Sequence, residues 1–295
     1  MSPRPTSTGT IQGGAASLVH LRGRTIGVVG LGQIGGSVVR GLSRLRPGLE
    51  VIGHDLRADL APRVRRFCSW CDRLDDLVAQ SDVVMLAVPV PASVRLLPRM
   101  ARLARQRSAR TRLLVCDVGT VKASIVAAAA RLRADFDFIG LHPLAGGERN
   151  GWDAAEAGLF AGRPFIFCPA GRRQDRLARE LIGLLGGRAM RIDARTHDQV
   201  VAETIGLPHL VAFAAAGIAT PTPAHDLLRG RSWGSLTRVA ASDPAMVAGF
   251  FHGNGANQIR VLRRLRSRLD TIERALRQPS GRALERWLAR WRREG

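Results

Sequence analysis

From Thr25 onwards, short apolar runs alternate with stretches of helical periodicity. Such alternation is typical of βαβ units, which build a parallel sheet with helices on both faces. The pattern predicts strands at Thr25–Gly30, Glu50–His54, Asp82–Val88, Leu113–Asp117, Phe136–Leu141 and Pro164–Cys168. Helices are expected between them, including Gln33–Leu45, Ala92–Arg105 and Ala123–Arg133. After Asp193 the strand pattern stops, and the remaining residues predict helices alone.

A glycine-rich segment follows the first predicted strand and opens the first predicted helix. It reads Gly30-Leu31-Gly32-Gln33-Ile34-Gly35, which is GxGxxG. In this context Gly30 permits a tight turn, Gly32 lets the backbone approach a pyrophosphate, and Gly35 lets helix and strand pack closely. The helix N-terminus then faces the phosphates. The motif predicts a dinucleotide site to which Gln33 and Ile34 also contribute; the alternative is a glycine turn that serves packing only.

The residues after the second predicted strand bear on the choice of cofactor. Asp55 lies 20 residues after Gly35, where a carboxylate accepts the ribose hydroxyls of NAD and repels the 2′-phosphate of NADP. Arg57 weakens this inference, because an arginine there could pair with a 2′-phosphate. We therefore expect NAD, with NADP less favoured. Val88 and Pro89, at the end of a later strand, are further candidate cofactor contacts.

These patterns predict an α/β protein with a doubly wound Rossmann-type sheet followed by an all-helical domain. The expected parts are a loose tail over residues 1–23, a dinucleotide-binding domain over 24–192 and a helical substrate and dimerisation domain over 193–295. A chain of 295 residues suits two such domains. No apolar run is expected to reach the roughly 20 residues of a membrane span, and the N-terminus lacks a signal-peptide pattern. A cytoplasmic protein is therefore expected.

The net charge is +21, which ordinarily points to nucleic acid or an anionic surface. The basic residues are spread evenly, however, with 22 in residues 1–150 and 23 in residues 151–295. We interpret the charge as a bias of composition and expect neither nucleic acid nor a membrane as a partner. Of the 45 basic residues 44 are arginines, so Lys122 is a candidate for a specific role. Cys68 and Cys71 form a single CxxC without a second pair, and no metal site is predicted.

Two further segments carry side chains suited to catalysis. The first is Asp117-Val118-Gly119-Thr120-Val121-Lys122, in which Thr120 could cap the next helix. The second begins with His142 at the end of a strand and reaches Glu148 six residues later. A histidine is the usual general base near neutral pH, and a carboxylate can orient it or contact substrate. Taken alone, His142 could be a structural histidine and Lys122 a solvated surface charge.

Together these segments resemble the prephenate and arogenate dehydrogenases of tyrosine biosynthesis, a family that includes 4-amino-4-deoxyprephenate dehydrogenases. The resemblance spans about Thr25 to Leu276. It rests on GLGQIGGS, DVGTVK, HPLAGGE, HDQVVAETIGLPHLVAFA and TRVAASDPAM, whose order and spacing also fit. It implies an oxidative decarboxylation in which ring C4 gives a hydride to NAD, and a helical domain that pairs two subunits.

The resemblance also implies roles for individual residues. His142 matches the catalytic histidine, Thr120 the family's usual serine, which contacts the substrate hydroxyl and nicotinamide, and Lys122 the lysine near the cofactor. Arg238 matches the arginine that binds a substrate carboxylate, a task that suits a planar guanidinium. Glu148 matches the acidic residue near the substrate entrance. The plainer alternatives are a helix cap for Thr120 and surface ion pairs for Arg238 and Glu148.

The departures from the family lie in the helical part of the chain. Gly206 stands where relatives have a pocket histidine, Ile205 where they have a serine, and Val247 where they usually have a tryptophan. These changes predict an altered ring substituent or side chain on the substrate. His197 and Asp198 are expected to act as a helix cap and hinge rather than as a metal pair.

The C-terminal stretch has the apolar spacing of a helix that packs on other helices, which suits a homodimer interface. The residues concerned are Leu262, Leu265, Leu269, Ile272 and Leu276. The sequence therefore predicts a homodimeric NAD-dependent dehydrogenase that acts on prephenate, arogenate or a close analogue. One alternative is a 4-amino-4-deoxyprephenate dehydrogenase of a specialised pathway. Another is a non-catalytic NAD-binding or nucleic-acid-associated protein, whose DNA binding would collapse with salt.

Overall fold

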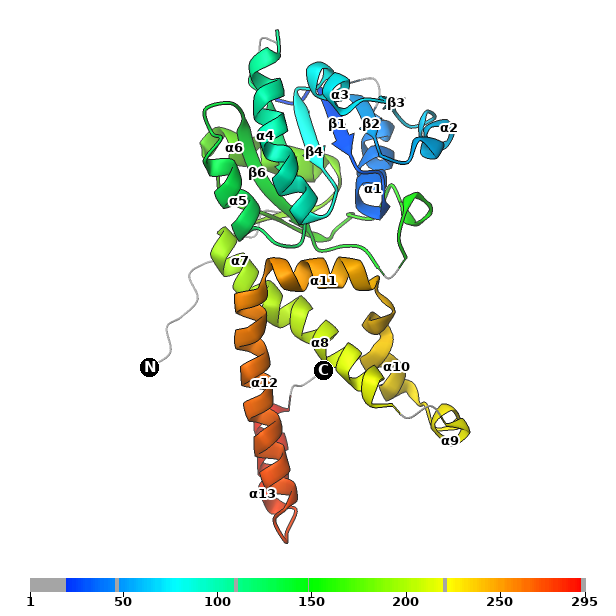
Figure 1. The fold of residues 1–295 in the computed structure, drawn as a ribbon, viewed down its shortest axis with the longest axis vertical. Helices are drawn as coiled ribbons and strands as arrows, with labels where there is room; N and C mark the ends of the chain where they lie inside the picture. The colour runs from blue at the N-terminus through cyan, green and yellow to red at the C-terminus, as the bar shows by residue number, and fades with distance from the viewer. Residues whose placement is uncertain (1–19, 46–47, 109–110, 148, 220–221, 293–295) are drawn as a thin grey trace. The chain divides into compact units, whose positions relative to one another are not determined.

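The computed structural model describes residues 20–45, 48–108, 111–147, 149–219 and 222–292 (Figure 1). Within these residues the chain forms two compact units. The first runs to His197 and includes Ser242–Gly249, and the second comprises Asp198–Ala241 and the residues from Phe250 onwards. Each unit is described by itself.

The first unit is an α/β domain. Its strands are β1 (Thr25–Val29), β2 (Glu50–His54), β3 (Ser69–Trp70), β4 (Val83–Leu86), β5 (Leu114–Asp117), β6 (Asp137–Pro143), β7 (Pro164–Phe167) and β8 (Arg188–Arg191). Its helices are α1 (Gln33–Leu42), α2 (Ala61–Val64), α3 (Leu74–Gln80), α4 (Val90–Gln106), α5 (Ala123–Ala130), α6 (Arg172–Leu184), the first half of α7 (Ala194–Val201) and the first part of α11 (Pro244–Gly253), with short 3₁₀ turns at Ser43–Leu45, Ala58–Leu60 and Trp152–Ala154.

The strands form one sheet in the order β3-β2-β1-β4-β5-β6-β7-β8. The reversal of strand order beside β1 is the doubly wound arrangement that the sequence predicted, and it opens a crevice at the carboxyl ends of the strands. Two predictions about the sheet are wrong. The pairing of β6 with β7 is antiparallel, so the sheet is mixed, and the strands β3 and β8 were not predicted.

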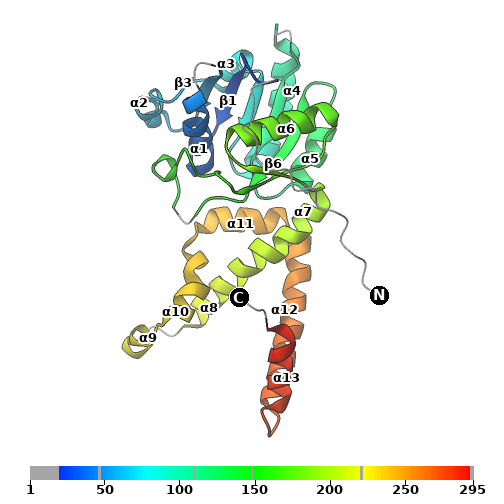
Figure 2. The same cartoon turned by 180° about the vertical axis from the view of Figure 1, so that it is seen from behind.

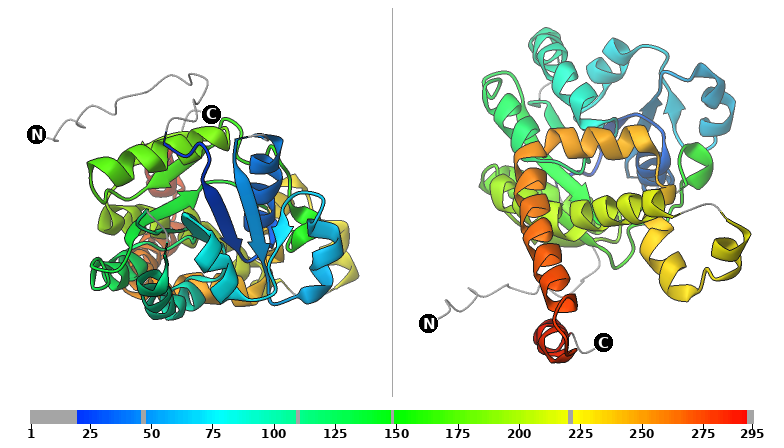
Figure 3. Two further views of the ribbon diagram at one scale, coloured as in Figure 1. Left: turned by 90° about the horizontal axis from the view of Figure 1, so that it is seen from above. Right: turned by 60° about the horizontal axis from the view of Figure 1, so that its bottom comes forward.

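Two hydrophobic cores cover the two faces of the sheet. One core contains apolar side chains of α1 and α6, and the other those of α3, α4 and α5. Neighbouring residues of β1 alternate between them, since Val28 belongs to the first core and Val29 to the second. Figure 2 and the left view of Figure 3 show the sheet between these two helical layers. Burial on both faces explains why the central strands read as continuous apolar runs.

The start of the described chain is attached to the first core. Leu21 is buried, and the backbone N–H groups of His20 and Leu21 donate to the carboxylate of Glu180 on α6. The prediction of a loose tail up to residue 23 is therefore wrong for these two residues. Residues 1–19 lie outside the described part.

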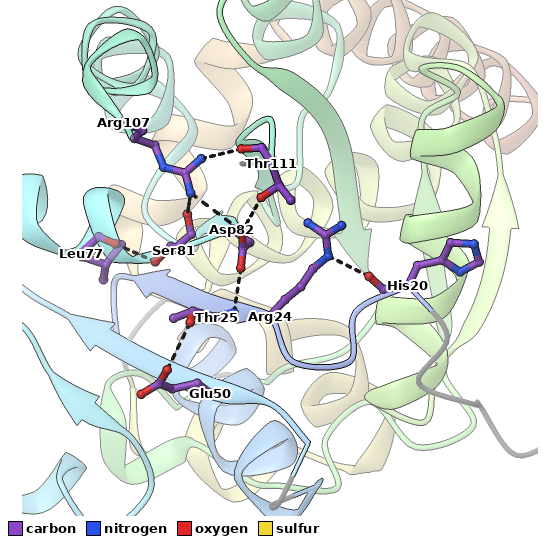
Figure 4. A network of polar contacts seen from close by, with 9 residues as sticks. All are labelled: His20, Arg24, Thr25, Glu50, Leu77, Ser81, Asp82, Arg107 and Thr111. Carbon is purple, nitrogen blue, oxygen red and sulfur yellow. Dashed lines mark hydrogen bonds and ion pairs between the residues drawn. The ribbon is translucent and has the colours of Figure 1, made fainter. Parts of the chain in front are cut away.

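A polar network joins the amino-terminal ends of β1 and β4 (Figure 4). The Asp82 carboxylate accepts hydrogen bonds from the Thr25 N–H and the Thr111 hydroxyl, and Arg107 donates to the carbonyl oxygens of Ser81 and Thr111. The Arg107 side chain is almost fully buried, and this burial lowers its pKa. The network therefore lies at the amino-terminal ends of these parallel strands, opposite their carboxyl ends.

The second unit consists of helices. They are the end of α7, a π-helical turn (Ala202–Gly206), α8 (Leu207–Ile218), α9 (Pro223–Leu227), α10 (Arg231–Thr237), a 3₁₀ turn (Arg238–Ala241), the end of α11 (Pro244–Gly253), α12 (Gly255–Leu276) and α13 (Arg282–Trp291). Figure 2 shows α13 folded back along α12, where Arg268 stacks over Trp291.

The helical run Ala194–Ile218 is 25 residues long with a mean hydropathy of 1.5 in its most apolar window, enough by length and composition to cross a membrane. The expectation that no such run exists is therefore wrong. The same composition also suits a helix that packs on other helices.

Candidate active site

The glycine-rich loop lies between β1 and α1. Gly30 has a φ of +89°, which favours glycine, and a Cβ there would come within 2.6 Å of the Ala87 carbonyl oxygen and 2.7 Å of Val88. A Cβ on Gly35 would collide with the carbonyl oxygen of Gly30, whereas one on Gly32 would meet no atom within 4 Å. Gly32 is also the N-cap of α1, and no side chain caps that helix end. These features fit a dinucleotide pyrophosphate, because backbone N–H groups and open space meet at the helix N-terminus.

Asp55 links the end of β2 to this loop. Its carboxylate accepts the Leu31 N–H at 2.6 Å and the Arg57 N–H at 2.9 Å. The guanidinium of Arg57 is paired with Asp59 at 2.7 Å, and both of these side chains are exposed. The carboxylate that was predicted to accept ribose hydroxyls is thus at the loop, while the nearby arginine is engaged by another carboxylate.

The side chain of Gln33 connects the glycine-rich loop to the segment after His142. Its Oε1 accepts the Gly147 N–H at 3.2 Å, and Gly146 adopts a φ of +120° beside it. Ile34 packs against the core of the first unit. Val88 and Pro89 follow β4, and Pro89 is the N-cap of α4. Glu148 lies outside the described residues.

Lys122 and Asp117 form an ion pair in which neither side chain is exposed. Asp117 ends β5, and its Oδ2 also accepts the Gly119 N–H at 2.9 Å. Its Oδ1 is buried and has no hydrogen-bond partner within the described part of the chain. Burial raises the pKa of Asp117, an effect that Lys122 opposes. The sequence left two interpretations of Lys122, a specific role or a solvated surface charge. Its burial in an ion pair rules out the surface charge.

The side chains of Lys122 and Val126 both pack closely on a glycine in the neighbouring strand. A Cβ on Gly140 of β6 would come within 3.3 Å of Lys122 Cδ. Lys122 is the N-cap of α5, and no side chain caps that helix. The prediction that Thr120 caps this helix is wrong; Thr120 lies two residues earlier and is half-buried.

His142 lies at the carboxyl end of β6 and is 5% exposed. Its Nδ1 lies 2.9 Å from Nε2 of His197 on α7, and the two rings meet edge to face at 82°. Burial, then His197, then Lys122 hold the pKa of His142 well below 6.5. The imidazole is therefore neutral at neutral pH and suited to accept a hydrogen bond.

His197 is the residue of the candidate site that sequence reasoning missed. The prediction made it part of a helix cap, but the cap of α7 is the Asp193 carboxylate, which accepts the N–H groups of Arg195 and Thr196. His197 and His142 are 55 residues apart in sequence, so no local pattern could reveal their contact.

In the second unit, the missing side chain of Gly206 leaves space that Gln258 occupies. A Cβ on Gly206 would overlap the Gln258 carboxamide. This carboxamide is buried, and neither its nitrogen nor its oxygen has a hydrogen-bond partner among the residues that the structure describes. Arg238 begins the 3₁₀ turn after α10 and is exposed. Val247, on the part of α11 that groups with the first unit, is buried.

Comparison with known protein families gives two adjoining matches. Residues 40–192 match the nucleotide-binding domain of prephenate dehydrogenase, and residues 193–290 match its dimerization domain. The first match begins after the glycine-rich loop, so the loop is assigned from its own geometry.

Individual relatives give the same picture. A cyclohexadienyl dehydrogenase of Zymomonas mobilis is 31% identical over 233 residues, covering 75% of this chain and 78% of the relative. A prephenate dehydrogenase of Lactococcus lactis is 26% identical over 88% of this chain and 73% of its own length. The structure of a prephenate dehydrogenase from Aquifex aeolicus with hydroxyphenyl propionate and NAD⁺ superposes with a TM-score of 0.78 at 25% identity, over 92% of this chain and 96% of that one. A Synechocystis arogenate dehydrogenase gives 0.70 at 26% identity, over 90% and 97%.

Proposed function

The chain belongs to the prephenate dehydrogenase family, and from this premise we propose that it oxidatively decarboxylates prephenate or a close analogue such as arogenate. It is an NAD-dependent dehydrogenase. The observation that carries the substrate proposal is the buried, neutral His142 at the carboxyl edge of the sheet that also holds the glycine-rich loop. In doubly wound folds this edge is where the cofactor and its reaction partner meet.

The proposed reaction balances without net proton release from the ring hydroxyl. The C4–H bond breaks and its electron pair leaves as hydride, which the nicotinamide accepts. The bond between the ring and its carboxylate also breaks, carbon dioxide leaves, and that electron pair completes the aromatic ring. The oxygen at C4 keeps its proton as a phenol. The enzyme therefore needs a hydrogen-bond acceptor for this hydroxyl as positive charge develops at C4.

The residues of this chain have distinct roles in the proposal. His142 accepts the hydrogen bond from the C4 hydroxyl, and Thr120 offers a second hydroxyl contact. Lys122 is buried in its ion pair with Asp117, so we assign it to shaping the charge around His142 rather than to direct proton transfer. Arg238 binds a substrate carboxylate with its planar fork.

One observation favours the alternative substrate 4-amino-4-deoxyprephenate. The position at which relatives have a pocket histidine is Gly206, and the carboxamide of Gln258 occupies the vacated space without a partner. A carboxamide both donates and accepts hydrogen bonds, so the lost imidazole is replaced by a group of different polarity. An amine at C4 could also donate to His142.

We further propose that the protein is a cytoplasmic homodimer. Residues 193–290 match a dimerization domain. On α12 the side chains of Leu262, Leu269 and Leu276 are at least 40% exposed, although they continue one apolar seam. A second copy of the chain would cover this seam.

The reaction class is tested by stoichiometry. Purified protein is incubated with NAD⁺ and each candidate substrate, and NADH, carbon dioxide and the aromatic product are quantified together. The proposal predicts equal amounts of all three. NADH formed without carbon dioxide would replace the proposal with a simple alcohol oxidation.

A further inference from the structure

We propose that His197 is a positioning residue that fixes His142 in the tautomer with its proton on Nδ1 and a lone pair on Nε2. The proposal rests on the proposed function only for the task of His142, since the contact between the two rings belongs to the structure itself. His197 lies on α7 and is 2% exposed.

The geometry requires one proton between the two rings. Nδ1 of His142 and Nε2 of His197 are 2.9 Å apart, a normal hydrogen-bond length, and one of the two nitrogens must donate. If His142 donates, its Nε2 keeps a lone pair and can accept from a substrate hydroxyl. If His197 donates, Nε2 of a neutral His142 carries a proton and can no longer accept. The partner of His142 therefore decides which of two opposite roles its reactive nitrogen can have.

Burial and the charges around His142 disfavour a third arrangement, in which it is protonated on both nitrogens. The groups that act on its charge are His197 from α7 and Lys122 from the start of α5, and Lys122 is itself paired with Asp117 from β5. All three effects, including burial, disfavour an imidazolium. In the Ser-His-Asp template, a carboxylate partner stabilises the imidazolium that forms. A histidine partner can set the tautomer without placing a carboxylate charge beside the imidazole, which suits a reaction in which the C4 oxygen keeps its proton.

The backbone of His197 is fixed at the start of α7, and its ring packs against the ring of His142. Its backbone N–H donates to the Asp193 carbonyl at 2.9 Å, in the first turn of a helix that the Asp193 side chain caps. The edge-to-face packing of the two rings adds a fixed orientation. Since the hydrogen-bond partner of one ring nitrogen sets the tautomer and orientation of an imidazole, loss of His197 should change the tautomer of His142.

The test uses the full-length protein with His197→Leu, which removes the partner, and His197→Gln, whose side-chain oxygen can still accept from His142. The first measurement is ¹⁵N NMR of labelled histidine side chains, with His142→Asn to assign the signals. We expect Nδ1 of His142 to be the protonated nitrogen in the wild type and in His197→Gln, and a mixture of tautomers in His197→Leu. Protonated Nε2 on His142 in the wild type would overturn the proposal.

The second measurement is steady-state kinetics. His197→Leu should lower kcat by roughly 10- to 100-fold while KM and NAD binding change little, and His197→Gln should recover most of the loss. Adding His197→Leu to His142→Asn should cost nothing more, because both changes remove one function. Equal losses in the Leu and Gln variants, with an unchanged tautomer, would show a purely structural role. If no substrate is turned over but the NMR result holds, the proposed function fails and the positioning role stands.

Discussion

The ammonium group of Lys122 and the carboxylate of Asp117 pair with each other in complete isolation from solvent. Removing one partner leaves the other charge buried, so we expect Lys122→Met to lower the free energy of unfolding by about 3–5 kcal/mol. The double variant Lys122→Met/Asp117→Asn should recover most of this loss. Urea unfolding measures both.

The control for this prediction is the exposed pair of Arg277 and Glu273, one helical turn apart on the surface. Arg277→Met should cost less than about 1 kcal/mol. If Lys122→Met were as mild as the control, the buried ion pair would not be a feature of the folded protein.

The low pKa of His142 makes stability depend on pH in a defined direction. In the unfolded chain this histidine binds a proton near its ordinary value of 6.5, while in the folded chain it does so only at lower pH. Its contribution to stability is therefore complete above about pH 6.5 and is lost as the pH falls toward the folded-state pKa. We expect the free energy of unfolding to fall more steeply between about pH 7 and pH 5 in the wild type than in His142→Asn. Parallel slopes would contradict the assignment.

Substitutions of Gly206 and Gln258 should have non-additive effects on the free energy of unfolding. In the wild type, Gly206→Ala overlaps the buried carboxamide, and we expect a loss of about 1–3 kcal/mol from overpacking. In a Gln258→Ala background the same substitution should be neutral or stabilising by up to about 1 kcal/mol, because alanine favours a helix over glycine. Urea unfolding of the wild type, the two single variants and the double variant gives the coupling free energy between the two residues. Additive effects would mean that Gln258 does not fill the space above Gly206.

The cofactor preference should depend on Asp55 more than on Arg57. Asp55→Asn removes the carboxylate that repels a 2′-phosphate, so the ratio of kcat/KM for NAD to that for NADP should fall. Asp59→Asn releases the guanidinium of Arg57 and should mainly raise the kcat/KM for NADP. If the wild type prefers NADP, or if Asp55→Asn leaves the ratio unchanged, the decisive role passes to Arg57.

The features that could be predicted are those that depend on residues close together in the sequence. The glycine-rich loop, the central strands and the onset of the helical part follow from local periodicity and from one short motif. The edge strand Arg188–Arg191 has arginine at both ends and is mostly exposed, so it carries no apolar run. The strand Ser69–Trp70 is too short to have a period. The reversal of β7 depends on how its connection returns to the sheet, which the strand's own residues do not encode.

In the candidate site, too, local motifs could be predicted and long-range contacts could not. His142, Lys122 and the loop glycines were found because they occur in motifs. The contacts that define their chemistry were not, since His142 meets His197 across 55 residues, and Gly206 meets Gln258 from another helix. Composition suggested that the single lysine had a role, but only the packing of β5 and β6 around it shows that the role is a buried pair.

The most direct test of the account is NADH formation by wild-type and His142→Asn protein, with prephenate, arogenate and 4-amino-4-deoxyprephenate supplied in parallel. We expect the wild type to oxidise at least one of the three. His142→Asn should lower its turnover by roughly 10²- to 10³-fold, the usual loss when one preorganised hydrogen-bonding group at the reacting centre is removed, while NAD⁺ binding is kept. Wild-type protein that binds NAD⁺ but oxidises none of the three, or a His142→Asn variant with near-normal turnover, would contradict it.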